Sequence, residues 1–104
     1  MTQAVLRVEG LPGAPLDAAA AFHHVWLPLA RDALSGGDLL LVFASADHSH
    51  RAWRLAAVQE LAREAAPKRV NGVVGDASTA IDQAAEWLAR APGITGQLLA
   101  VEPA

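Results

Sequence analysis

The chain has 104 residues, of which 53% are hydrophobic and 18% charged, and this composition predicts one folded domain over residues 1–104. The net charge of −3 comes without a basic cluster, so neither nucleic acid nor an anionic membrane surface is an expected partner. The chain has no cysteine, which excludes disulfides and thiolate chemistry. No signal-peptide pattern or bilayer-length apolar run is present, so we expect a cytoplasmic protein.

The first half of the chain predicts strand, helix, strand and helix in turn. A short strand covers residues 4–8, and a turn-rich break leads to a helix over residues 18–34 that Asp17 is expected to cap. The continuous apolar run at residues 39–43 is typical of a strand covered on both faces. A polar connection then leads to a second helix over residues 50–65.

The second half continues the alternation. Residues 70–74 form a β-prone run, and Ser78 or Thr79 is expected to cap a third helix that reaches Ala91. Residues 97–101 form the last strand. Alternating strands and helices with short connections predict an α/β fold: a small open parallel sheet of about four strands, in the order β-α-β-α-β-α-β, with helices packed on it.

Apolar residues occupy more than one side of the helices. The first helix carries a stripe that we expect to face the sheet, made of Phe22, Val25, Trp26, Leu29 and Ala33. A second row on that helix, and residues off the inward stripes of the other two, predict a surface for a partner. The predicted interface residues are Trp26, Leu27, Leu34, Trp53, Ala56, Ala57 and Trp87.

Several segments, in the right order, resemble the short-chain dehydrogenase/reductase family. APGITGQLLAV at residues 91–101 resembles the family's closing segment, and EWLA at residues 86–89 matches the helix before it. LAREAAPKRVN at residues 61–71 resembles the passage from the catalytic helix into the next strand. Leu27-Pro28 and the strand ending at Ser45 resemble the approach to the catalytic serine. The resemblance covers roughly residues 18–102 and implies the second half of a Rossmann-like dehydrogenase fold.

The family's catalytic residues do not all carry over. Its chemistry needs a tyrosine and, four residues later, a lysine; this sequence has no tyrosine, and the two positions fall near Asp47 and at Arg51. Ser45 matches the catalytic serine. The glycine-rich turn that binds the dinucleotide is absent, so no cofactor is predicted and hydride transfer by the family mechanism is not expected. The resemblance also implies subunit interfaces on the first two helices and on the third helix with the last strand.

A polar segment follows the second strand, at the edge where open α/β sheets bind ligands. Asp47, His48 and His50 are metal-ligand types, which His23 or His24 could complete. The alternative is a polar loop in which Asp47 or Ser49 caps the next helix. Pairing of Ser45 with His48 as nucleophile and base lacks the surrounding motif.

Three functions follow from these observations. The favoured hypothesis is a non-catalytic subunit that assembles with itself, as a homodimer or higher oligomer, or with a complete short-chain dehydrogenase. The second is a small enzyme or metal-binding protein that uses Asp47, His48 and His50. The third is a binding module for a nucleotide or acyl-CoA in a vestigial cleft.

Overall fold

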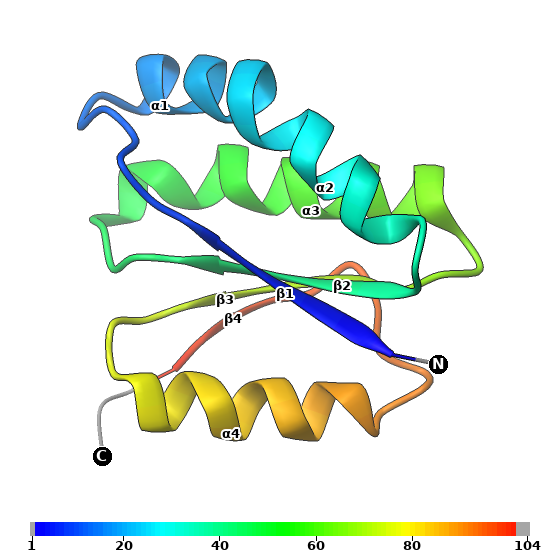
Figure 1. Cartoon of the computed structure of the whole chain (residues 1–104). Coiled ribbons are helices and arrows are strands. Elements are labelled where there is room, and N and C mark those ends of the chain that lie inside the picture. The colour runs from blue at the N-terminus through cyan, green and yellow to red at the C-terminus, as the bar shows by residue number, and fades with distance from the viewer. Residues whose placement is uncertain (1, 102–104) are drawn as a thin grey trace.

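The computed structural model describes residues 2–101 and contains one open sheet with helices on both faces (Figure 1). The four strands are parallel and lie in sequence order, β1-β2-β3-β4. The predicted α/β class, the open parallel sheet and the order of strands and helices along the chain are confirmed. The strands are β1 (Gln3–Val8), β2 (Asp38–Phe43), β3 (Val70–Val74) and β4 (Leu98–Ala100).

The helices cover the two faces unequally. Figure 1 shows α1, α2 and α3 over one face and α4 alone beneath the other. The helical elements are α1 (Pro15–Ala21), the π-helical turn η1 (Phe22–Trp26), α2 (Leu27–Leu34), the 3₁₀ turn η2 (His48–His50), α3 (Arg51–Ala65) and α4 (Ser78–Ala89). Within residues 2–101 no helix has the length and apolar character needed to cross a bilayer.

Both faces of the sheet bury apolar side chains, because β2 lies inside the sheet and has helices above and below. All six of its residues are buried, as the continuous apolar run predicts. Leu39, Leu41 and Phe43 belong to the cluster under α1–α3, while Leu40 and Val42 pack with residues of α4. The alternation follows from the two-residue period of a strand.

The first helix differs from the prediction in its start and in its buried stripe. It begins with Pro15, and Ala14 stands at the cap position instead of Asp17, because proline without an N–H suits the first helical position. Val25 and Leu29, predicted to face the sheet, are 51% and 45% exposed. Phe22 is buried as predicted, and the other buried positions are Ala18, Ala30 and Leu34.

The π-helical turn explains this shift. The Leu27 N–H donates to the Phe22 carbonyl, five residues back, and Pro28 has no N–H to continue the ordinary pattern. The wider turn changes the side of the helix on which the following residues lie. As a result, Ala30 and Leu34 are the residues of α2 that are buried against the core. Smaller differences affect α4, which begins at Ser78 without a side-chain cap and ends at Ala89.

A buried ion pair joins three elements at the amino-terminal edge of the sheet. Arg69, just before β3, contacts Asp38 of β2, with 3.0 Å between Nη2 and Oδ2. The Arg69 backbone N–H also donates to Asp38. Arg69 Nη1 donates to the carbonyls of Leu88 and Ala91, 2.8 and 2.7 Å away, at the end of α4. A cation here satisfies carbonyls that a helix end leaves free.

Arg69→Met should lower the free energy of unfolding by about 3–5 kcal/mol, because it leaves the Asp38 carboxylate buried without its cation. Urea denaturation followed by circular dichroism measures the change. Arg63→Met is the control, because Arg63 is exposed on α3 and should change stability by less than about 0.5 kcal/mol. Equal effects of the two substitutions would contradict the role of Arg69.

Candidate functional site at the carboxyl edge of the sheet

The loop after β2 holds most of the predicted site residues. Asp47 caps the 3₁₀ turn η2: its carboxylate accepts hydrogen bonds from the Ser49 hydroxyl and from the Ser49 N–H, the latter at 2.9 Å. These two bonds, the hydroxyl first, hold the pKa of Asp47 below its ordinary value. Asp47 and His48 are both exposed. Of the two caps that the sequence offered, Asp47 is the one used, and it caps η2, whereas α3 begins after His50 without a side-chain cap.

Ser45 pairs with an acidic side chain from a different loop. Its N–H donates to Asp76 at 3.0 Å, which connects the ends of β2 and β3. Hydrogen bonds from the Ser45 backbone and hydroxyl lower the pKa of Asp76. The partner of Ser45 is therefore Asp76, and no hydrogen bond joins Ser45 to His48 among the residues described.

His50 is a structural histidine whose two ring nitrogens are both engaged. It is 6% exposed, with Nε2 2.9 Å from the Gly13 carbonyl and Nδ1 accepting from Trp53 Nε1 at 3.1 Å. The carbonyl can only accept and the indole only donate, so the neutral ring must carry its proton on Nε2. His50 thereby attaches the loop after β1 to α3.

The predicted metal ligands do not converge. Across residues 2–101 no three His, Cys, Asp or Glu side chains come together in a metal-binding arrangement. His23 lies on η1, where its Nδ1 is 2.7 Å from the Ala19 carbonyl, and His24 beside it is exposed. Arg51, at the position of the family's lysine, is exposed at the start of α3.

Arg54 is the residue at this edge that sequence reasoning missed. Its side chain lies 7% exposed on the buried side of α3, with the guanidinium carbon 4.9 Å from the centre of the Phe43 ring and 5.8 Å from Trp53. Nη1 donates to the Ala44 carbonyl at 2.9 Å, and burial lowers the pKa of Arg54. Its spacing of four residues from Val58 places it on the inward stripe of α3, and this spacing could have predicted that Arg54 is buried.

The edge pocket, a cavity of about 240 Å³, opens beside Arg54. Its apolar walls come from the end of β1 and the following loop, including Val8, Leu11 and Pro12. Ser45, Glu9, His50 and Arg54 are the side chains with polar groups that line it.

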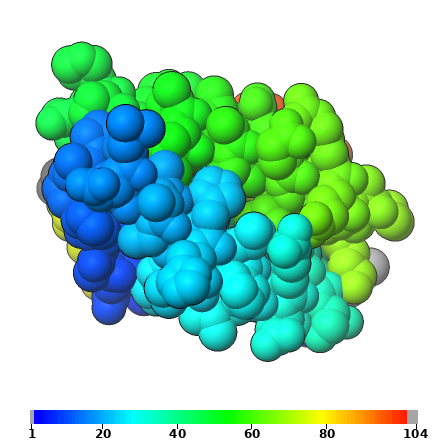
Figure 2. Space-filling view, turned by 90° about the horizontal axis from the view of Figure 1, so that it is seen from above, coloured from blue at the N-terminus to red at the C-terminus, as the bar shows by residue number. Residues whose placement is uncertain are grey.

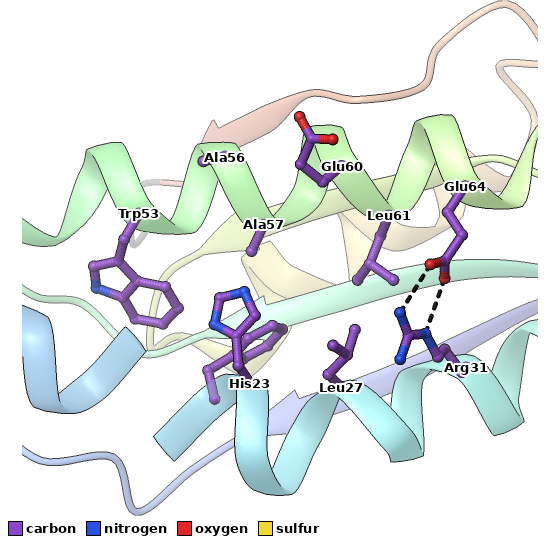
Figure 3. Close-up of a pocket in the computed structure, with 10 residues that line it drawn as sticks. His23, Leu27, Arg31, Trp53, Ala56, Ala57, Glu60, Leu61 and Glu64 are labelled. Carbon is purple, nitrogen blue, oxygen red and sulfur yellow. Dashed lines mark hydrogen bonds and ion pairs between the residues drawn. The ribbon is translucent and has the colours of Figure 1, made fainter. Parts of the chain in front are cut away.

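A second hollow, the helix groove, lies between η1–α2 and α3 (Figure 3). It has a volume of about 260 Å³. Arg31 and Glu64 join across it by two hydrogen bonds of 2.8 and 2.9 Å. Its lining residues are Phe22, His23, Leu27, Arg31, Trp53, Ala56, Ala57, Glu60, Leu61 and Glu64.

The seven predicted interface residues are spread over the molecule. Leu34 and Ala57 are buried within the chain, Trp26, Leu27 and Trp53 are half-buried, and Ala56 is exposed. Trp53 packs on the rings of Phe22 and Phe43, at 5.6 and 5.9 Å between centres. The other six residues lie on η1, α2 and α3, whereas Trp87 lies on α4, across the sheet from them, and is 55% exposed.

The parallel sheet with connecting helices is a fragment of Rossmann-like type. A family model described as SDR-like, short chain dehydrogenase-like protein, matches residues 6–101, and the chain belongs to this family. No curated protein and no solved structure matches the chain.

The hydrogen bonds of Ser49 should set the acidity of Asp47. Because the folded-state pKa is lowered, the cap stabilises the fold above the ordinary aspartate pKa and is lost as the pH falls through the folded value. Ser49→Ala should raise the pKa of Asp47 toward the ordinary value in a carboxyl NMR titration. The pKa of Asp76, whose donors come from Ser45, should stay unchanged. A shift at both carboxylates would contradict the assignment.

His50→Ala should lower the free energy of unfolding by about 1–3 kcal/mol, because it breaks two hydrogen bonds and frees the loop at Gly13. Thermal and urea unfolding measure this loss. His48→Ala, two residues away and exposed, should leave stability within about 0.5 kcal/mol. If the two variants unfold alike, His50 does not attach the loop.

Proposed function

We propose that this protein is a non-catalytic member of the SDR-like family that assembles with a second copy of itself through the helix groove. The observation that carries the proposal is a contrast within one chain. The residues for hydride transfer are missing, whereas the helix face that the family resemblance associates with subunit contact has an open apolar groove.

The chemistry at the carboxyl edge supports the non-catalytic part. The family's proton donor is a tyrosine, and the chain contains none. Asp47 near that position has a lowered pKa, so it is ionised at neutral pH and has no proton to give to a carbonyl. Arg51 near the lysine position holds its proton too firmly to replace a lysine in proton transfer.

Strand order gives further support. Open α/β sheets bind dinucleotides in the crevice where the order of the strands reverses. The strands from β1 to β4 follow sequence order, so residues 2–101 contain no such reversal. The described strands therefore offer none of the usual crevice for a nicotinamide cofactor.

The helix groove has the anatomy of an interface. Figure 2 looks down on the helices, with α1–α2 in blue to cyan and α3 in green beside it. Leu27, Trp53 and Leu61 provide apolar surface in the groove, and the Arg31–Glu64 pair lies across it (Figure 3). An apolar centre with a charged rim is typical of protein interfaces.

A second copy suits this groove because the two sides carry complementary groups. The η1 side carries His23 and His24, and the α3 side carries Glu60 and Glu64. A two-fold axis along the groove places the η1–α2 side of each copy over the α3 side of its partner. Ala56, one turn before Glu60 on α3, is small and exposed, and it allows the helices of the two copies to approach closely.

Ala56→Glu should weaken self-association by at least about tenfold, or about 1.4 kcal/mol, because it places a charge in the centre of the interface. The site is exposed in a single chain, so the fold should be kept. Native mass spectrometry and light scattering measure the dimer. Ala89→Glu makes the same change at an exposed position of α4 and should leave the dimer intact.

Two outcomes would contradict the proposal. A wild-type chain that stays monomeric at high micromolar concentration has no such self-association, and a complex formed only with a complete short-chain dehydrogenase would replace the second copy as the partner. A dimer that survives Ala56→Glu and is lost in Trp87→Ser uses α4 instead of the helix groove.

A further inference from the structure

We propose that Arg54 makes the edge pocket a binding site for a small monocarboxylate. This inference does not depend on the proposed self-association, because the edge pocket and the helix groove are separate cavities. Its basis is a buried cation without an anionic partner. Arg54 is 7% exposed, yet no salt bridge to it occurs among the residues that the structure describes.

The hydrogen bonds of the guanidinium leave one edge free. Nη1 donates to Ala44, whereas Nε is buried and has no hydrogen-bond partner in the described chain. Nη2 has no acceptor among the described residues either, and unlike Nε it is not fully buried, so it keeps access to the surface. Nε and Nη2 lie on the same edge of the guanidinium plane, and this edge is the one that a carboxylate can bind with two parallel hydrogen bonds.

Energy favours an anion at this place. An unpaired charge removed from water is costly, and the rings of Phe43 and Trp53 offset only part of that cost. A carboxylate that reaches Nη2 meets Nε beside it, so both free N–H groups gain an acceptor. The ligand thereby supplies the counter-charge that the protein does not.

Size and charge define the class of ligand. A cavity of about 240 Å³ is below the usual range of about 300–1,000 Å³ for drug-sized ligands, so a nucleotide or acyl-CoA is too large to be enclosed. Glu9 also lines the pocket and repels a dianion such as phosphate more strongly than it repels a monoanion. Val8, Leu11 and Pro12 provide apolar walls for a short aliphatic chain. A small monocarboxylate meets all three conditions.

The test is an NMR titration of the ¹⁵N-labelled protein with butyrate, butanol and inorganic phosphate. Butyrate should give saturable shifts at the amides of Gly10 and Gly13 and at the side-chain Nε–H of Arg54. Butanol, with the same chain but no charge, and phosphate should bind at least about tenfold more weakly. Absence of saturation, equal binding of butanol or tighter binding of phosphate would overturn the proposal.

Three variants separate a specific fork from general attraction. Arg54→Met removes the cation and Arg54→Lys keeps the charge without the fork; both should weaken butyrate binding at least about tenfold. Arg51→Met removes an exposed charge one turn earlier and should bind butyrate like the wild type. Loss of binding in Arg51→Met, or retention in Arg54→Lys, would overturn the assignment. If Arg54→Met fails to fold, the lysine variant and the butanol comparison decide.

Discussion

The buried pair of Arg69 and Asp38 is the constraint on which the arrangement of the sheet and α4 depends. A single guanidinium contacts the first residue of β2 and the last carbonyls of α4, and it lies just before β3. Because α4 is alone on its face of the sheet, this contact replaces part of the lateral support that α1–α2 and α3 give each other on the other face. Asn71 extends the network, donating to the Ile94 carbonyl and accepting from the Gln97 N–H.

This network also explains what the family resemblance represents physically. The two most telling segments, at residues 69–71 and 91–97, are hydrogen-bonded to each other: Val70 donates to the Thr95 hydroxyl, and the Gly96 N–H donates to the Val70 carbonyl. Both segments therefore position β3, β4 and α4. A chain can keep these segments for its fold while the tyrosine of the family's chemistry is absent. Membership of the family therefore does not by itself establish an activity.

Local patterns predicted the elements well and the long-range contacts poorly. The apolar run predicted β2, and the residues that flank α3 predicted its ends. Both features depend only on residues that are neighbours in sequence. The buried side of α2 could not be predicted by a regular 3.6-residue period, since the turn at η1 changes the phase at one point. At the carboxyl edge, the capping role of Asp47 is local and was predicted. The partners of His50 and Arg54 were not, because Gly13 and Ala44 reach them only through the fold.

The order of the strands has a consequence for how the chain folds. Every neighbouring pair is parallel, so no hairpin can form between them, and each pairing must wait until a crossover of more than about 20 residues has closed. Yet each crossover reaches only the adjacent strand, so the two strands of each β-α-β unit pair directly with each other. Pairing between strands that are distant in sequence slows folding. The sequential strand order limits this effect, because a reversed order requires contacts between strands that are still farther apart in sequence. A parallel sheet with this strand order can therefore form by adding one strand at a time to its neighbour.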